Sequence, residues 1–243
     1  MIQSLFLAGA SGVIGRRLTP LLVAEGWRVF GMTRSREKVS RIKDLGAEAI
    51  VADVFDAPAV DLALSRARPD VVIHQLTDLP PGVDPNKMAE AAPRNARVRD
   101  EGTRNLLSAA VRCGARRFVA QSIAFAYADG PLPHGEDDPL NIEAEGSAGV
   151  SARGVASLEH QVLSAPLLGV ILRYGRFYGP GTGFDTASGK VGPVHADAAA
   201  HAAALAVVRG EPGIYNVAED DGAVSSEKAK RLLGWSAEWR ALS

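Results

Sequence analysis

The first residues whose types and spacing could do chemistry are three glycines near the start of the chain, within the segment GASGVIG at 9–15. A glycine lets the chain turn sharply, and its missing Cβ lets backbone N–H groups approach a ligand closely. If a strand precedes this segment and a helix follows it, the free N–H groups at the helix start face an anion. We therefore expect the diphosphate of a dinucleotide to be held by Gly9, Ser11, Gly12, Val13, Ile14 and Gly15.

Residues after two later apolar runs indicate which dinucleotide is bound. After the run that ends at Thr33 come Arg34 and Arg36, without the acidic residue that binds the ribose 2′-hydroxyl in NAD sites. A guanidinium forms two parallel hydrogen bonds with a phosphate, so Arg34 predicts NADP, with NAD as the alternative. Asp53 and Val54 follow the third run, where a carboxylate and an amide suit the adenine ring; a simple turn or helix-capping aspartate is the other interpretation.

Such residues need a frame of alternating strands and helices to position them. Short apolar runs alternate with longer amphipathic segments along most of the chain, which indicates parallel strands joined by crossover helices. Nearly continuous apolar runs are typical of strands whose sheet is covered on both faces. We expect strands at 4–8, 27–33, 49–52, 70–74, 117–121, 170–173 and 213–217, and helices at 12–25, 35–45, 57–67, 99–113, 150–163 and 195–209.

The predicted fold is therefore α/β, a Rossmann-like, doubly wound parallel sheet. The dinucleotide-binding domain is expected over 1–175 and the small lobe over 176–243, with 194–217 returning to the Rossmann sheet. Two segments, 77–93 and 127–149, interrupt the rhythm and are rich in proline, glycine and polar residues. Both follow carboxyl ends of predicted strands, where open α/β sheets bind ligands; ordinary surface loops are the alternative.

The composition narrows the class of protein. The chain has 243 residues, of which 47% are hydrophobic and 23% charged, and its formal net charge is −1. This balance is typical of a globular protein and gives no reason to expect nucleic acid or a membrane surface as a partner. The single cysteine, Cys113, excludes an intrachain disulfide and favours a cytoplasmic location. The sequence shows no spacing of metal ligands, so we expect a small-molecule substrate and no metal.

Taken together, the motifs resemble the short-chain dehydrogenase/reductase superfamily, and most closely its extended and atypical branch, the NAD-dependent epimerase/dehydratase family. The resemblance rests on GASGVIG at 9–15, DV at 53–54, VVIHQLT at 71–77, EGTRNLLSAA at 101–110, RFVAQSIAFAY at 117–127, LRYGRFYGPG at 172–181, VHADAAA at 194–200 and GIYNVAED at 213–220. It implies the strand order 3-2-1-4-5-6-7 and, against the longer chains of the family, a reduced C-terminal substrate lobe. It implies that Gln75, Leu76 and Thr77 pass beside the cofactor. It also implies that 173–181 lies under the nicotinamide and opens the substrate lobe.

The resemblance fails at the family's catalytic pair. Family enzymes use Tyr-x-x-x-Lys, in which the lysine lowers the pKa of the phenol so that it exchanges a proton near neutral pH. This sequence contains no tyrosine followed four residues later by a lysine. Anchored on Glu159, the tyrosine position holds Ser151 and the lysine position holds Val155. The usual serine or threonine of the fifth strand falls on Ile123, with Ser122 one residue earlier.

An acid or base for hydride transfer must then come from elsewhere. We take Ser122 and Tyr127 as the candidate catalytic residues. His74, Tyr174 and Tyr178 are further candidates for the proton donor. Each of the five has a structural alternative, such as strand-edge packing, a cofactor contact or a histidine whose nitrogens are satisfied within the core.

Two functions fit these observations. The first is an NADP(H)-binding oxidoreductase or epimerase/dehydratase-like enzyme of atypical mechanism, acting on a small polar or sugar-derived substrate. The second is a catalytically inactive NADP-binding sensor or regulatory protein. The missing pair favours the second, and the polar segments after strands four and five favour the first. The short stretch at 182–193 indicates a reduced lobe or omitted segments, and the helices at 99–113 and 150–163 either form a homodimer contact or only pack against the sheet.

Overall fold

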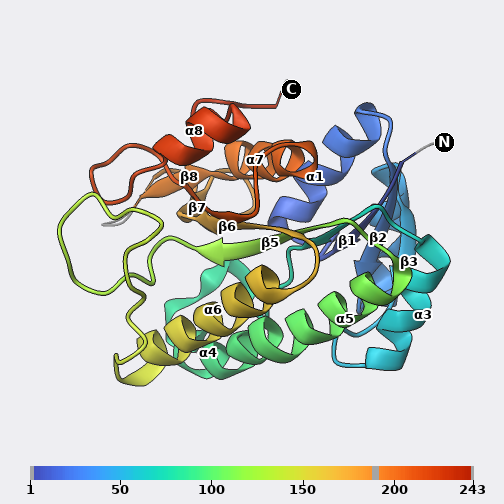
Figure 1. The fold of residues 1–243 in the computed structure, drawn as a ribbon, viewed down its shortest axis with the longest axis horizontal. Helices are drawn as coiled ribbons and strands as arrows, with labels where there is room; N and C mark the ends of the chain where they lie inside the picture. Colours follow the sequence, from blue (N-terminus) through green and yellow to red (C-terminus); the bar gives the residue numbers. More distant parts are fainter. Residues whose placement is uncertain (1–2, 188–191, 242–243) are drawn as a thin grey trace.

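The computed structural model describes residues 3–187 and 192–241 (Figure 1). Seven parallel strands form the main sheet, in the order β3-β2-β1-β4-β5-β6-β9. Their bounds are β1 Ser4–Ala8, β2 Arg28–Thr33, β3 Glu48–Val51, β4 Val71–His74, β5 Arg117–Ile123, β6 Leu168–Tyr174 and β9 Gly213–Val217. The predicted fold class and strand order are confirmed, because β9 is the seventh strand along the sheet. The order reverses between β1 and β4, which opens a crevice at their carboxyl ends.

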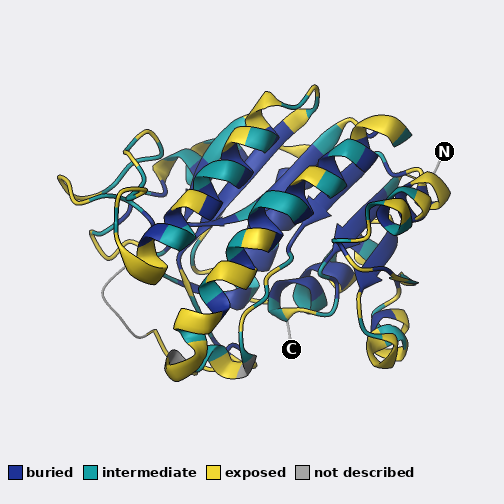
Figure 2. Ribbon diagram, turned by 90° about the horizontal axis from the view of Figure 1, so that it is seen from below, coloured by how far each residue is buried: buried dark blue, intermediate teal, exposed yellow. Residues whose placement is uncertain are grey.

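Helices cover both faces of the sheet. One face carries α1 (Val13–Ala24), α2 (Val39–Asp44), α7 (Ala196–Val208) and α8 (Glu227–Leu233), and the other carries α3 (Ala57–Ala67), α4 (Met88–Arg97), α5 (Thr103–Cys113) and α6 (Gly146–Ser164). Along β1, Leu5 and Leu7 enter one core cluster, whereas Phe6 and Ala8 enter the other. This alternation explains why the strands read as unbroken apolar runs. Figure 2 shows the buried inner faces of the helices and their exposed outer faces.

The segment 77–93 was predicted to be irregular, and in the structure only part of it is. It forms two short 3-10 turns, Pro81–Val83 and Pro85–Lys87, and then the helix α4, which passes through a π-turn at Val98–Gly102 into α5. The predicted helix at 99–113 is therefore the second half of a longer one. Pro93 lies inside α4 and removes one backbone hydrogen bond. Packing of α4 against α6 outweighs this loss, with Ala96 so close to Gly154 that a Cβ there would lie 3.0 Å from the Ala96 Cα.

Beyond β6, a small parallel sheet joins β7 (Arg176–Tyr178) to β8 (Pro193–His195), and neither strand was predicted. The long segment after β5 is tied down by isolated bridges from Tyr127 to Leu140 and from His134 to Val224. Helix α7 and strand β9 belong to the main layers, while the predicted division of the chain into two domains stays a prediction. Part of the short stretch at 182–193, namely 188–191, lies outside the described residues.

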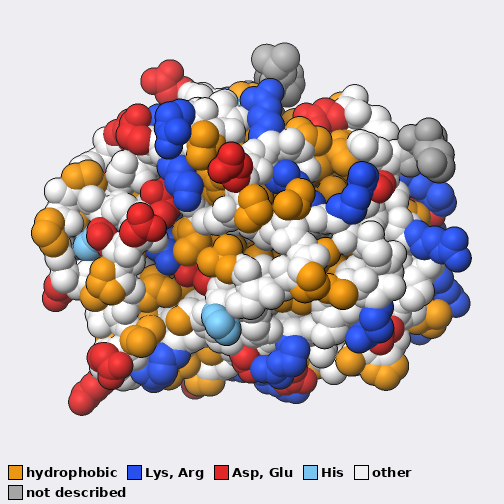
Figure 3. Space-filling model, viewed as in Figure 1, with side chains coloured by type: hydrophobic (Ala, Val, Ile, Leu, Met, Phe, Trp, Pro, Cys, Tyr) orange, Lys and Arg blue, Asp and Glu red, His pale blue; other side chains and the backbone are white. Residues whose placement is uncertain are grey.

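The outer surface is mixed in charge. Figure 3 shows acidic and basic side chains interspersed over one face of the molecule. Within the described residues, none of the helices is long and apolar enough to cross a membrane.

Candidate functional site

The glycine turn lies between β1 and α1, where the strand order reverses. Gly9 has a φ of +94°, and a Cβ there would lie 2.6 Å from the carbonyl oxygen of Gln75, directly after β4. A Cβ on Gly15 would overlap the backbone of Gly9 and Ala10. Gly9 thus allows the sharp turn, and Gly15 allows the helix to pack closely on it.

The amino end of α1 fits an anion. Gly12 caps this helix without a side-chain hydrogen bond, and the first turn contains no acidic residue. A Cβ on Gly12 would meet only the Gly9 carbonyl oxygen within 4 Å, at 3.3 Å, so the space outside the helix end is open. The first N–H groups of a helix have no partner within it, and the helix dipole is positive there. The N–H groups of Val13 and Ile14 are in this position, so the turn suits a diphosphate.

Beside the turn, the segment after β4 contains an unpaired acceptor. The Gln75 backbone N–H donates to the Ala8 carbonyl at 2.9 Å, and its side-chain Nε2 donates to the Tyr174 hydroxyl at 3.4 Å. Its Oε1 is buried and has no partner among the described residues. A buried acceptor without a donor is costly, so a hydroxyl or carboxamide of a bound dinucleotide would satisfy it. Leu76 is half-buried and Thr77 is exposed.

Arg34 lies at the end of β2 on the side expected for the adenine ribose. Its Nη2 is 3.3 Å from an Asp78 carboxylate oxygen, and Arg94 of α4 approaches the other oxygen at 3.6 Å. The side chains of Arg34 and Arg94 are 64% and 53% exposed, whereas that of Asp78 is 20% exposed and its backbone N–H donates to Asn95. Two exposed guanidinium groups thus share one fixed carboxylate, and a phosphate could compete for them.

Asp53 and Val54 form the turn after β3. The Asp53 carboxylate accepts the backbone N–H of Phe55 at 3.0 Å, which is a turn of the kind that the sequence left open. Asn105 of α5 donates to the Val54 carbonyl at 2.9 Å and holds this loop against the sheet. The carboxylate remains exposed, so its predicted contact with adenine stays a prediction.

The two candidate catalytic residues belong to one buried polar network. The Ser122 hydroxyl donates to Glu159 at 2.8 Å, and Glu159 forms a two-bond ion pair with Arg173 at 2.8 and 2.7 Å. Arg173 also donates to the Tyr127 hydroxyl at 2.8 Å, which itself donates to Asn216 at 2.6 Å. Burial opposes the charge on Arg173, but the Glu159 carboxylate outweighs it and raises the pKa of Arg173. Burial raises the pKa of Tyr127.

The other proton-donor candidates are also engaged. Both nitrogens of His74 have partners, Nε2 with the Thr103 hydroxyl at 3.1 Å and Nδ1 with the Leu76 N–H at 3.2 Å, and burial lowers its pKa to about 4. Burial raises the pKa of Tyr174, which is fully enclosed. The Tyr178 hydroxyl donates to Glu219 at 2.6 Å. Within the described residues, no group of three or more His, Cys, Asp or Glu side chains is arranged to hold a metal ion.

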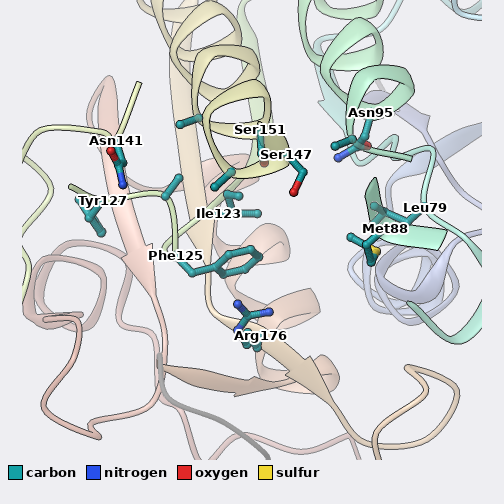
Figure 4. A pocket seen from close by; sticks show the side chains of 14 residues that line it. Leu79, Met88, Asn95, Ile123, Phe125, Tyr127, Asn141, Ser147, Ser151 and Arg176 are labelled. Carbon is teal, nitrogen blue, oxygen red and sulfur yellow. The ribbon is translucent and has the colours of Figure 1, made fainter. Parts of the chain in front are cut away.

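Ser151, predicted at the tyrosine position, faces a cavity of about 250 Å³ between α4, α6 and the segment after β5. Its hydroxyl accepts from Arg99 at 2.9 Å, and burial lowers the pKa of Arg99 to about 10. Figure 4 shows Leu79 and Met88 on one side of this cavity and Phe125 and Arg176 on another. The lining residues are Leu79, Met88, Ala92, Asn95, Ile123, Phe125, Ala126, Tyr127, Asn141, Ser147, Ala148, Ser151, Ala152 and Arg176.

With this geometry in hand, comparison with known proteins identifies the family. The profile of the NAD dependent epimerase/dehydratase family matches residues 5–213. The chain belongs to that family. The predicted resemblance is confirmed, and the family's dependence on a nicotinamide dinucleotide agrees with the glycine turn.

One curated relative in this family covers nearly the whole chain. A 3-diazoavenalumate denitrifying reductase from a Streptomyces species is 38% identical over 275 residues, which span 94% of this chain and 86% of the relative. The alignment is longer than the 243 residues of this chain, so the relative contains segments that this chain lacks. A UDP-glucose 4-epimerase from Mycolicibacterium smegmatis is 30% identical over 150 residues, which are 59% of this chain and 46% of that protein.

Solved structures of the epimerase/dehydratase type share the fold. The UDP-glucose 4-epimerase of Thermotoga maritima, in complex with UDP-glucose, has a TM-score of 0.77 at 17% identity and covers 97% of this chain and 94% of its own. The enzyme WbmG of Bordetella bronchiseptica, in complex with NAD, has a TM-score of 0.74 at 18% identity, with 99% and 91% covered. At these identities the likeness shows the fold alone.

Some residues of the site were not identified from the sequence. Met88 and Asn95 lie on α4, which was not predicted, and Ser147 lies in the first turn of α6, upstream of the predicted helix start. Arg176 lies within the predicted segment 173–181 but was not singled out. Its position two residues after a sheet strand, at the carboxyl edge where ligands bind, could have identified it from the sequence.

Proposed function

We propose that the protein is an NADP(H)-dependent reductase that passes hydride to an electrophile requiring no proton from the protein. One observation carries the proposal: every candidate acid or base, from Ser122 to Tyr178, has its polar atom engaged by a neighbouring residue or enclosed in the core. The lining of the cavity includes no histidine, lysine, aspartate or glutamate among the described residues. The site is thus suited to hydride transfer without general acid catalysis.

An aromatic diazonium ion is an acceptor of this kind. A bound reduced nicotinamide supplies a hydride. Reduction of a ketone then requires a proton on oxygen, whereas an arenediazonium ion plus hydride gives the arene and N2, with one C–H bond formed, one C–N bond broken and no proton consumed. The name of the Streptomyces relative describes a reductase that acts on a diazo compound and removes nitrogen. That reaction class therefore agrees with a cavity whose lining, within the described residues, includes no histidine, lysine, aspartate or glutamate.

The residues of this chain would then act by binding and orientation. The amino end of α1 and the glycine turn hold the diphosphate, and Arg34 holds the 2′-phosphate. Asn105 fixes the loop at Val54, which would lie beside the adenine of a bound dinucleotide. The apolar side chains of the cavity would pack against the acceptor and limit its orientations.

The NADP preference is tested by calorimetry with both coenzymes on the purified protein. We expect tighter binding of NADP+ than of NAD+, loss of this preference in Arg34→Glu, and no change in a matched control, Lys38→Glu, in the same loop. Asp78→Asn should raise the affinity for NADP+, because it frees Arg34 and Arg94 from their shared carboxylate. Equal affinities of the parent protein for the two coenzymes would contradict the assignment.

Turnover is tested with NADPH and two kinds of acceptor, an arenediazonium salt and a set of aldehydes and ketones. We expect NADPH oxidation with equimolar release of N2 from the diazonium salt, above the rate without protein, and a rate that varies little across neutral pH. Turnover confined to carbonyl acceptors would contradict the proposal. The second candidate, a sensor that binds NADP without chemistry, is favoured by the same engaged groups. Tight coenzyme binding with no turnover of any acceptor would support it.

A further inference from the structure

Arg176 is the only charged residue that lines the cavity within the described part of the chain. It is the first residue of β7, two residues after the end of β6. Its guanidinium carbon lies 4.4 Å from the centre of the Phe125 ring, in a cation–π contact. Figure 4 shows the two side chains together at the cavity. The position of this charge is therefore set by an aromatic ring that lines the same space.

The guanidinium of Arg176 has no carboxylate partner in the described residues, where no ion pair or side-chain hydrogen bond involves it. Arg173, three residues earlier, contrasts with it, because Glu159 satisfies its charge in the core. The stretches outside the described residues contain no aspartate or glutamate in the sequence. A cation stacked on an aromatic ring, without a counter-ion in the described residues and at the edge of a largely apolar cavity, is suited to an anionic ligand.

The rest of the cavity restricts the shape of that ligand. Phe125, Ile123, Leu79 and Met88 supply apolar walls, and the hydroxyls of Ser147 and Ser151 are the small polar groups on α6. The volume of about 250 Å³ is below the range, roughly 300 to 1,000 Å³, of pockets that hold drug-sized molecules. One aromatic ring with a short side chain fits such a space.

We propose that Arg176, stacked on Phe125, binds the carboxylate of the substrate and selects small, planar aromatic or conjugated acids. This inference rests on the proposed function, because it names the substrate class of the same cavity. A guanidinium pairs with a carboxylate through two parallel hydrogen bonds, which fixes the direction of the acid as well as its affinity. The planar remainder of the acid then lies along the apolar walls.

Binding is tested by calorimetry on the protein loaded with NADP+, with cinnamate and its neutral analogue cinnamamide as probes. We expect cinnamate to bind at least about tenfold more tightly than cinnamamide, the difference that one charge-assisted hydrogen-bonded pair supplies. Arg176→Gln should abolish this difference, and Arg176→Lys should retain part of it. Arg66→Gln, which removes one exposed positive charge from α3, is the matched control and should leave it unchanged. Because Arg176 is exposed, these variants should fold normally.

Three outcomes would overturn the inference. The first is equal binding of cinnamate and cinnamamide to the parent protein. The second is a loss of cinnamate affinity in Arg66→Gln as large as in Arg176→Gln. The third is a loss of NADP+ affinity in Arg176→Gln, which would place the guanidinium on the cofactor instead. The proposed function fails separately. Equal turnover of arenediazonium ions with and without a carboxylate would reject the role of Arg176 and keep the reductase. Arg176-dependent binding of cinnamate without any turnover would reject the reductase and keep the anion site.

Discussion

Replacement of Glu159 by glutamine is expected to destabilise the protein severely. The Glu159 and Arg173 side chains are 6% and 3% exposed, and the carboxylate accepts two hydrogen bonds from the guanidinium and one from Ser122. The variant keeps the shape and removes the charge, so the Arg173 cation is left buried without a counter-ion. Breaking a buried pair in this way costs about 3 to 5 kcal/mol, and for a chain of this length that lowers the melting temperature by roughly 6 to 20 °C.

The assay is urea unfolding, in which the midpoint should fall while the slope with urea concentration stays constant. Glu101→Gln is the matched control, because its partner Arg97 is 58% exposed and such a surface pair contributes at most about 1 kcal/mol. The double variant Glu159→Leu with Arg173→Met should recover part of the loss, since both charges are then removed. Recovery should be incomplete, because Arg173 also donates to Tyr127. A cost for Glu159→Gln no greater than that for Glu101→Gln would refute the reasoning.

Two further predictions concern residues that the sequence placed near the chemistry. Ser122→Ala should lower the free energy of unfolding by about 1 to 2 kcal/mol, because it removes a donor to a buried carboxylate. Turnover per folded molecule should be unchanged. A large fall in kcat without a loss of stability would instead support a catalytic serine. The pKa of His74 in the folded protein is about 4, below its value in the unfolded chain, so only the unfolded chain binds a proton between about pH 6.5 and pH 4. The free energy of unfolding should therefore fall by about 3 kcal/mol as the pH drops through this window. In His74→Asn the urea midpoint should fall less steeply with falling pH than in the parent protein. The same pH dependence of the midpoint in both proteins would contradict the assignment.

The local patterns of the sequence were sufficient for the strands of the sheet and for the glycine turn. Alternating apolar runs and amphipathic segments depend on neighbours a few residues apart, so the parallel strands and crossover helices could be inferred without coordinates. The strand order was predicted with the help of the family resemblance. The turn at Gly9 could be anticipated in the same way, because glycine adopts the positive φ of a sharp turn without a steric penalty. Helix α4 could not, since Pro93 weakens its local preference and only packing on α6 restores it.

The cavity and the polar network beside it depend on residues far apart in the sequence. From single residues, Ser122 and Tyr127 were plausible acids or bases, and nothing local indicated that Glu159, Arg173 and Asn216 would take their hydroxyls. The tertiary structure decided these pairings, because hydrogen bonds in a buried network depend on which side chains the fold brings within about 3 Å of each other. In the same way, Arg176 became a candidate for anion binding only when the fold stacked it on Phe125 and left it without a carboxylate partner in the described residues. The sequence by itself determined the sheet and its glycine turn through local propensity, whereas the availability of each polar group for chemistry followed from long-range packing.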